Sequence, residues 1–252
     1  MITYNRLFLR VAEIYFGENH EGTRADIFKH LERPDAIQGV HCSPFYTLVI
    51  DLRRHESELL SNMDRNTRYE IQRGQEKDNF SAEVHLVCPT EVLLEFCQFY
   101  DRFAAIKGLR KVNRAKLRAL RDASSLTLSF ARQGEEAPIV WHSYIRARDC
   151  ARLLLSASLF RSEADQRSRQ LAGRANRFLH WADMLRFKAA GLSVLDMGGW
   201  YEGTADQDLL RINAFKKGFG GEVTRTFNAE VAGTLKGDLA LRGLGILRRI
   251  RS

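Results

Sequence analysis

The sequence predicts a mixed α/β chain of the α+β kind, in which a mostly antiparallel sheet is flanked by helices. Three strand-like segments follow one another at hairpin spacing in the middle of the chain, over residues 126–159. Helical periodicity lies on both sides of them, and a shorter pattern of strand, helix and strand precedes them over 45–87. Because each half has strands and helices of its own, we expect two related lobes.

The first half starts with an apolar, β-branched segment and continues with helical spacing rich in arginine. Pro89 and Thr90 then mark a second helix start, with Thr90 at the N-cap and Glu91 in the first turn. The elements predicted here are a strand over 45–52, a helix over 56–77, a strand over 81–87, a helix to residue 106 and a basic helix over 113–123.

The second half places its three strands at 126–132, 138–146 and 151–159. A glycine loop over 170–175 is predicted to lead into a helix over 176–190, which Gly191 ends as a C-cap. The remaining predicted elements are a strand over 192–197, a helix over 206–217 with Leu209, Leu210, Ile212 and Phe215 on one side, and an alternating strand over 222–229.

The length of 252 residues allows one large domain or two small ones. We place a boundary near Cys88 to Thr90, which divides the chain into a smaller lobe over 1–89, a larger lobe over 90–232 and a tail over 233–252. In the tail, leucines and basic side chains fall near helical spacing. Such a segment can lie on an anionic membrane surface, or it can be a frayed end or a dimer contact.

The net charge of +8 points to an anionic partner such as CoA, a nucleotide-sugar, tRNA or an acidic membrane. The four cysteines form no C-x-x-C pair, so we expect no metal site and a reducing compartment. No apolar run approaches the ~20 residues that span a bilayer. Charged residues interrupt the apolar start of the chain, so we expect no signal peptide and a cytoplasmic location.

The predicted glycine loop contains Gln170, Gly173, Arg174 and Ala175, and Asn176 follows as the first residue of the predicted helix. A glycine lets the backbone approach a ligand closely, and the free N–H groups of a helix's first turn bind phosphates. The loop therefore predicts a site for the pyrophosphate of an acyl-CoA, and with it a group-transfer enzyme.

A second glycine-rich patch follows at Phe215-Lys216-Lys217-Gly218-Phe219-Gly220-Gly221. Together with Gln170, Gly173 and Ala175, it makes the second half resemble a GNAT acyltransferase domain, whose acyl-CoA loop reads Gln/Arg-x-x-Gly-x-Gly/Ala. The whole chain, from about residue 45 to about residue 228, is more similar to the FemAB-like branch of that superfamily. The other matching pieces are Ile50-Asp51-Leu52, Asn66-x-Arg68-x-x-Ile71, Asn176 to Trp181 and Asp196-Met197-Gly198-Gly199.

Three residues are candidates for catalysis. The resemblance implies that Lys216 binds substrate phosphate or stabilises charge, whereas the residues alone also allow a solvated lysine. Asp196 ends a short strand, where it can orient or deprotonate an acceptor amine or can simply cap the glycine turn. Histidine side chains in general can act as bases near neutral pH, and His142 is predicted to share a strand face with Tyr144. The pair can therefore serve as base and substrate contact, or can belong to the core.

Two arginines of the first-half helix, Arg68 and Arg73, are candidates for binding an anionic acceptor, because guanidinium groups grip phosphates and carboxylates bidentately. The resemblance favours Arg68. The alternative is a solvated, arginine-rich helix face.

We therefore expect an N-acyltransferase that moves an acyl group, acetyl for instance, from acyl-CoA to an amine of a cell-envelope or polysaccharide precursor such as an amino sugar. The resemblance also implies an alternative, an aminoacyl-tRNA-dependent transferase acting on a peptidoglycan precursor. Such proteins are usually longer and often carry a coiled-coil arm, which this chain lacks. A non-catalytic binding module is the third possibility.

Overall fold

The computed structural model describes residues 1–159 and 166–250, which form two compact units. The first unit combines Met1–Tyr46, Arg114–Ala123 and the chain from Thr224 onward, and the second combines Thr47–Asn113 with Ser124–Val223. Both units are discontinuous in sequence, unlike the contiguous segments 1–89 and 90–232. That division of the chain stays a prediction.

The first unit is built on β1 (Ile2–Arg6), β2 (Leu9–Tyr15), β3 (Ile27–Arg33) and β10 (Glu222–Ala232). β1 and β2 form an antiparallel hairpin, β2 and β3 run parallel, and β3 pairs antiparallel with β10. Its helices are α4 (Arg114–Asp122) and α7 (Leu235–Ile250). The predicted tail is thus helical as far as it is described, and its last two residues lie outside the described residues.

The sequence pattern does not predict the three N-terminal strands, because charged residues interrupt their apolar spacing. Glu13 is one of these residues, yet it is buried within β2. It accepts hydrogen bonds from the hydroxyls of Tyr4 (2.6 Å) and Tyr15, and it forms an ion pair with Lys116 of α4 (2.7 Å). A long-range partner therefore makes a polar position compatible with the core.

The second unit has a sheet in the order β4-β9-β8-β7-β6-β5, in which all neighbours except β8 and β9 are antiparallel. The mixed, mostly antiparallel sheet with flanking helices is thus confirmed. The strands are β4 (Cys42–Asp51), β5 (Phe80–His85), β6 (Leu126–Gln133), β7 (Val140–Ala147), β8 (Cys150–Ser158) and β9 (Val194–Gly199).

Helices cover both faces of this sheet. Trp141 of β7 packs against Phe96 and Phe99 of α3 (Thr90–Lys107), whereas the next residue, His142, contacts α5 (Gln166–Ala189). Because successive side chains of a strand point to opposite faces, α3 and α5 lie on opposite sides. On the α5 side, apolar residues of the helix fill the core with those of β4 and β9, among them Leu48, Ile50, Trp181, Met184, Phe187 and Leu195.

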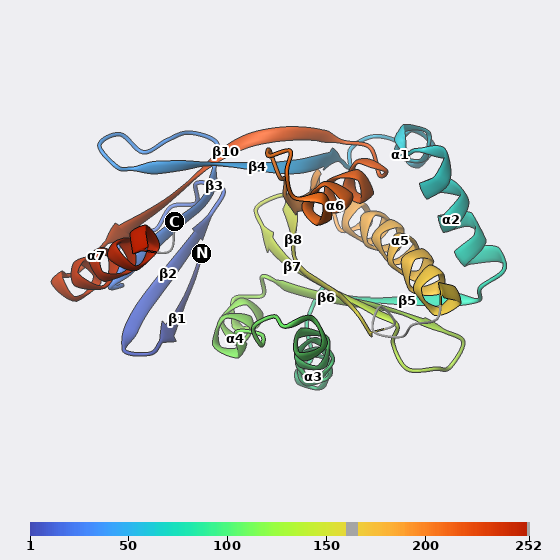
Figure 1. The fold of residues 1–252 in the computed structure, drawn as a ribbon, viewed down its shortest axis with the longest axis horizontal. Helices are drawn as coiled ribbons and strands as arrows, with labels where there is room; N and C mark the ends of the chain where they lie inside the picture. The colour runs from blue at the N-terminus through green and yellow to red at the C-terminus, as the bar shows by residue number, and fades with distance from the viewer. Residues whose placement is uncertain (160–165, 251–252) are drawn as a thin grey trace. The chain divides into compact units, whose positions relative to one another are not determined.

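The predicted helix over 56–77 is wrong in one respect, because it consists of two helices, α1 (Glu56–Asn62) and α2 (Arg65–Glu76). Met63 is extended, with ψ of 153°, and Asp64 caps α2 by accepting a hydrogen bond from the N–H of Thr67 at 2.5 Å. Figure 1 shows α2 beside α5, and apolar spacing continues across the break. Periodicity alone therefore did not reveal it.

Two further helix starts differ from the prediction. Pro89, not Thr90, occupies the N-cap of α3, and no side chain caps this end. More importantly, α5 begins at Gln166, so residues 170–175 lie inside a helix and form no glycine loop. Leu171, Ala172, Ala175 and Leu179 bury one side of this segment, and such packing offsets the ~1 kcal/mol that a helical glycine costs.

The other predicted elements of this unit are confirmed, including the C-cap at Gly191, whose φ is +82°. Asp206 caps α6 (Gln207–Lys217) by accepting hydrogen bonds from the N–H groups of Asp208 and Leu209, both at 3.0 Å. No helix among the described residues combines the length and the apolar character needed to cross a membrane.

Candidate active site

The two parallel strands β8 and β9 pair over only three positions. Cys150, Ala151 and Arg152 lie opposite Val194, Leu195 and Asp196, and the pairing then stops, although β8 continues to Ser158 and β9 to Gly199. β8 remains paired with β7 on its other side, and its residues 152–156 are half-buried. Within the described residues, β8 and β9 form no strand pairs beyond Arg152, which leaves an open edge of β8 at the carboxyl ends of both strands.

Lys216 reaches the end of β9 from the last turn of α6. Its ammonium donates a hydrogen bond to the carbonyl oxygen of Gly199 at 2.5 Å, and Lys216 as a whole is only 9% exposed. Burial lowers the pKa of Lys216 to about 8, Asp196 opposes this shift, and Arg152 adds to it. The structure therefore brings the predicted residues Lys216 and Asp196 together, with Lys216 buried rather than solvated.

The carboxylate of Asp196 is also buried, and it accepts hydrogen bonds from the N–H of Gly198 at 2.6 Å and from the hydroxyl of Thr47. The first of these is the glycine-turn cap that the sequence analysis named as an alternative. It holds the turn at Gly198, whose φ is +77°, below the ammonium of Lys216. A catalytic role for Asp196 stays a prediction.

The glycines that follow Lys216 allow close packing. The backbone of Asp64, between α1 and α2, donates a hydrogen bond to the carbonyl of Gly218 at 2.9 Å. Gly221 has φ of +80°, and a Cβ there would collide with the carbonyl oxygen of Val49 on β4. The motif therefore fixes the end of α6, and with it Lys216, against the rest of the unit.

The apolar side predicted for α6 is only partly buried, since Phe215 packs against the core and Leu210 is half-buried. Leu209 is 39% and Ile212 44% exposed, whereas the polar residues Asn213 and Lys216 are buried. Asn213 exchanges two hydrogen bonds with the backbone of Tyr201, at 2.7 and 3.1 Å. These partners decide which side of the helix faces inward, and apolar spacing does not reveal them.

A cleft of about 590 Å³ lies between α2 and α5. Four arginines line it, together with one acidic residue and three other residues: Arg73, Arg169, Arg174, Arg177, Glu70, Gln166, Gln170 and Gly173. Arg174 is already engaged, since it donates to both carboxylate oxygens of Asp78, at 2.5 and 3.3 Å. The guanidinium of Arg177 lies 4.9 Å from the ring centre of Phe215, the neighbour of Lys216.

The residues predicted to hold a cofactor separate into two groups. Gln170, Gly173 and Arg174 line the cleft, whereas Ala175 is fully buried in the core and Asn176 turns toward His142. Because all five lie within α5, their backbone amides are not those of a helix start, and that part of the prediction is wrong. Any phosphate in this cleft would instead meet guanidinium groups.

Sequence reasoning missed Arg169 and Arg177, which lie four residues on either side of Gly173 along α5. The misplaced helix start hid this spacing, which puts them on one helix face. Arg73 was predicted and does line the cleft. Arg68 does not, and its guanidinium donates to the carbonyls of Ser61 (3.2 Å) and Met63 at the end of α1.

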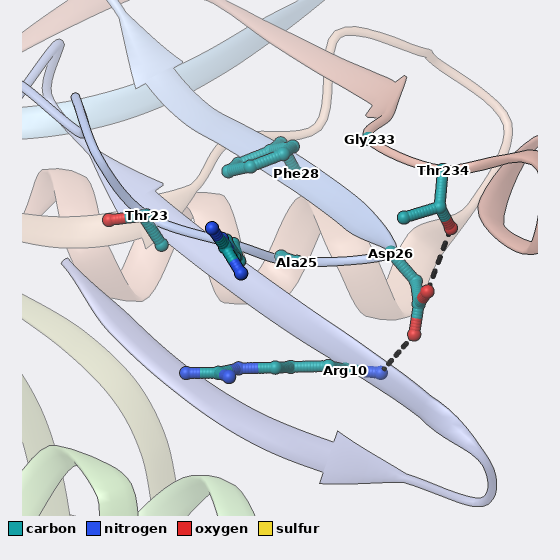
Figure 2. A pocket seen from close by; sticks show the side chains of 8 residues that line it. Arg10, Thr23, Ala25, Asp26, Phe28, Gly233 and Thr234 are labelled. Carbon is teal, nitrogen blue, oxygen red and sulfur yellow. Dashed lines mark hydrogen bonds between the residues drawn. The ribbon is translucent and has the colours of Figure 1, made fainter.

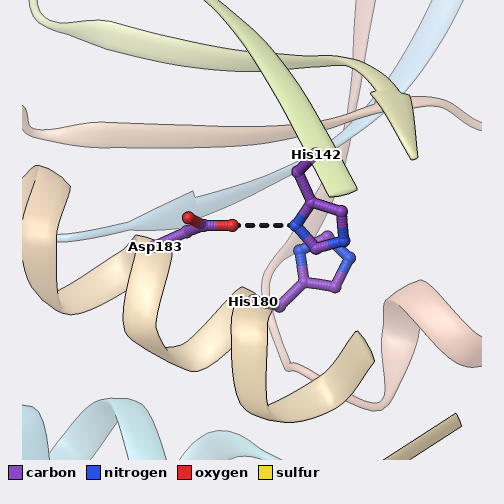
Figure 3. Close-up of side chains that lie close together, drawn as sticks. All are labelled: His142, His180 and Asp183. Carbon is purple, nitrogen blue, oxygen red and sulfur yellow. Dashed lines mark hydrogen bonds and ion pairs between the residues drawn. The ribbon is translucent and has the colours of Figure 1, made fainter. Parts of the chain in front are cut away.

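His142 belongs to a buried polar cluster between β7 and α5 (Figure 3). Its Nδ1 lies 2.8 Å from a carboxylate oxygen of Asp183, and its Nε2 lies 2.7 Å from the side-chain oxygen of Asn176. Tyr144 donates to the same carboxylate oxygen at 2.7 Å and lies 3.3 Å from Nδ1 of His180. His142 and Tyr144 share a strand face, as predicted, and His180 and Asp183 were missed.

With both ring nitrogens engaged and no exposed surface, His142 has no atom that a substrate in the cleft can reach. The rings of His142 and His180 are 4.1 Å apart. Burial, together with the neighbouring His142, Lys216 and Arg177, holds the pKa of His180 well below its usual value.

The first unit has a cavity of its own, of about 400 Å³, near the start of α7 (Figure 2). On its wall, the carboxylate of Asp26 accepts hydrogen bonds from the N–H of Arg10 (2.8 Å) and the hydroxyl of Thr234 (2.7 Å). Phe28 and Gly233 also line it. None of the predicted site residues lies there.

No protein-family model matches this sequence, and no curated protein matches it. Solved structures do. A structure of FemX aligns with a TM-score of 0.59 and 13% identity over 73% of this chain, which spans 61% of the FemX chain. The C-terminal domain of a lysylphosphatidylglycerol synthetase from Agrobacterium fabrum gives a TM-score of 0.55 and 17% identity, over 88% of this chain and 72% of that one.

L-PGS from Bacillus licheniformis aligns with a TM-score of 0.53 and 13% identity, over 85% of this chain and 70% of its own. The chain therefore has a fold similar to that of FemX, as the FemAB-like resemblance of its motifs implied. At these identities the similarity concerns the fold alone.

Proposed function

We propose that this protein is an acyltransferase that moves an acyl group from a phosphate-bearing carrier to an amine. The observation that carries the proposal is the arginine-lined cleft of α2 and α5, which adjoins Phe215 and thus the buried Lys216. Four arginines face one glutamate there, an excess of positive charge that suits a polyanionic ligand.

Unsatisfied donors support an anionic ligand. The Nε atoms of Arg73 and Arg177 are buried and have no hydrogen-bond partner within the described residues. Nε of Arg73 forms only a long ion pair with a carboxylate oxygen of Asp78, at 3.9 Å, which is beyond hydrogen-bond distance. A buried donor without a partner costs ~1–3 kcal/mol, which phosphate oxygens would recover if the guanidinium groups turned these atoms toward the cleft.

The first candidate donor is an acyl-CoA, with acetyl as the simplest acyl group. Its diphosphate would bind Arg73, Arg169 and Arg177, and the unpaired edge of β8 would offer hydrogen bonds to the extended arm that carries the thioester. The acceptor would be the amine of a cell-envelope or polysaccharide precursor such as an amino sugar.

The second candidate donor is an aminoacyl-tRNA. It is favoured by the fold similarity to FemX and to the two lysylphosphatidylglycerol synthetase structures, and by the absence of a glycine loop at residues 170–175. The same arginines would then bind the RNA backbone near the ester. The acceptor would be a peptidoglycan precursor or an aminolipid.

In either case the amine nitrogen attacks the acyl carbon, the carbonyl oxygen gains negative charge, and the bond to the carrier's sulfur or oxygen breaks. The new amide keeps the acyl group, and the carrier leaves with a proton that the amine loses. At pH 7 most of Lys216 is protonated, since its pKa is about 8. Its ammonium would stabilise the charge on the oxygen, and Asp196 would orient the amine.

A transfer assay with two labelled donors tests this function. Acetyl-CoA and charged tRNA are each offered with amine acceptors, to wild type and to Lys216→Met. We expect one donor to transfer its label in the wild type, with loss of at least ~100-fold in the variant, as for removal of one oxyanion donor. Transfer that survives in Lys216→Met, or no transfer from either donor, would reject the proposal.

A further inference from the structure

We propose that the buried cluster between β7 and α5 is a metal site, in which His142, His180, Asp183 and Tyr144 bind one divalent ion of the Zn²⁺ type. The proposal is independent of the transferase function. Figure 3 shows the two imidazoles and the carboxylate side by side, and one potential ligand atom of each lies within 4.8 Å of the others.

The spacing of the polar atoms fits tetrahedral coordination. Nδ1 of His142 lies 2.8 Å from Oδ2 of Asp183 and 3.2 Å from the hydroxyl oxygen of Tyr144. That hydroxyl oxygen lies 2.7 Å from Oδ2 of Asp183 and 3.3 Å from Nδ1 of His180. Zn²⁺ bonds of ~2.0–2.1 Å to nitrogen and oxygen place tetrahedral ligands ~3.3 Å apart, so small movements create the site.

The surroundings of these atoms are those of a metal site. Nε2 of His142 lies 2.7 Å from the side-chain oxygen of Asn176, and such an outward N–H bond leaves Nδ1 free to bind a cation. Oδ1 of Asp183 is buried and has no hydrogen-bond partner within the described residues.

Charge balance assigns the role of Tyr144. One aspartate and two neutral imidazoles leave a divalent ion with one uncompensated positive charge, near Lys216 and Arg177. On binding, the phenol of Tyr144 and the imidazole of His142 at Nδ1 give up to solvent any proton that they hold there. The carboxylate and the phenolate then balance the ion, which would tie β7 to α5.

Metal content tests the proposal directly. The chain is produced without a histidine tag, refolded with Zn²⁺ or Co²⁺, dialysed and analysed by mass spectrometry. Refolding gives the ion access to a fully buried site. We expect about one ion per chain and, with Co²⁺, the intense visible absorption of tetrahedral coordination. Fewer than ~0.1 ions per chain without that absorption would overturn the proposal.

Variants locate the ion. Asp183→Asn and His180→Asn should abolish binding, and Asn176→Ala should weaken it by about 10–100-fold. The matched control is His30→Asn, which alters the other close histidine pair, His20 and His30, at 5.0 Å between ring centres. This control should keep the ion. Binding that survives in Asp183→Asn and disappears in His30→Asn would contradict the assignment, and the wild-type result stands even if a variant does not fold.

Discussion

The guanidinium of Arg177 stacks on the ring of Phe215, with 4.9 Å from its Cζ to the ring centre. Arg177 lines the cleft, and Phe215 precedes Lys216, so this contact joins the anion-binding surface to the residue proposed to stabilise the reacting oxygen. Burial lowers the pKa of Arg177, as expected for a cation held against an aromatic ring instead of water. Both parts of the candidate site meet at this contact.

Replacing Arg177 should weaken donor binding. Hydrogen bonds to charged groups contribute ~1.5–3 kcal/mol, so we expect Arg177→Met to raise the Kd for the donor by about 10–100-fold. The matched control is Arg186→Ala, an exposed arginine in the last turn of the same helix. Equal effects of the two changes would indicate a general charge effect and not a site.

The pH dependence of activity should report Lys216. Burial lowers its pKa to about 8, so the ammonium form, on which the proposed role depends, is lost as pH rises above about 8. We expect kcat to fall on the alkaline side near that pH. Lys216→Arg keeps its charge and should retain a reduced activity without this fall, whereas an unchanged alkaline limb would remove Lys216 from the chemistry.

The free energy of unfolding should also depend on pH through Lys216, and the direction of this dependence follows from the pKa shift. The pKa of Lys216 is 10.5 in the unfolded chain and about 8 in the folded one, so between these values the unfolded chain binds more protons. Stability therefore rises with pH across that window, by about 3 kcal/mol from this group. Urea unfolding of wild type and Lys216→Met at several pH values measures it, and the difference between the two should shrink toward pH 10.5.

Two glycines with nearly equal φ angles allow the cost of a positive φ to be measured apart from the cost of a steric clash. Gly191 and Gly221 have φ of +82° and +80°, but only at Gly221 would a Cβ meet a neighbour, the carbonyl of Val49. We expect Gly191→Ala to cost ~1–2 kcal/mol of unfolding free energy and Gly221→Ala clearly more. Equal losses in denaturant titrations would show that the motif's last glycine serves conformation alone.

In the first unit, Glu13 should be needed for stability. Burial raises the pKa of Glu13. The charge of Lys116 and the hydrogen bonds from Lys116, Tyr15 and Tyr4 lower this pKa by a larger amount, so the net shift is downward. Its stabilising contribution is therefore present above the ordinary glutamate pKa of 4.5 and disappears as pH falls through the lower, folded value. Glu13→Ala should cost ~3–5 kcal/mol, because it removes the buried carboxylate that Lys116, Tyr4 and Tyr15 share; a loss under ~1 kcal/mol would contradict this.

Local patterns predicted much of the fold. The three hairpin strands, the face shared by His142 and Tyr144, and the ends of α5 and α6 at Gly191 and Lys217 follow from alternation, helical spacing and glycine. The motifs also identified Lys216 and Asp196, and the structure places these two residues close together. These features depend on residues close in sequence, where propensity and periodicity act.

Features set by distant partners were not predicted. The burial of Glu13 depends on Lys116, the break between α1 and α2 on the hydrogen bond from Asp64 to Gly218, and the side of α6 that faces inward on Tyr201. The start of α5 at Gln166 was hidden by Gly173, whose cost is outweighed by packing. Because the helix was predicted to start at Asn176, its spacing did not indicate that Arg169 and Arg177 lie on the same helix face as Gly173.

The measurement that tests the central claim most directly is calorimetric titration of the donor against its phosphate-free counterpart. Acetyl-CoA is compared with acetyl-pantetheine, and charged tRNA with the aminoacyl nucleoside, in wild type and in the double variant Arg73→Gln with Arg177→Met. We predict that one phosphate-bearing donor binds the wild type at least ~10-fold more tightly than its counterpart, and that the double variant abolishes this difference. Equal affinities in the wild type would contradict the claim that the cleft binds the carrier's phosphates.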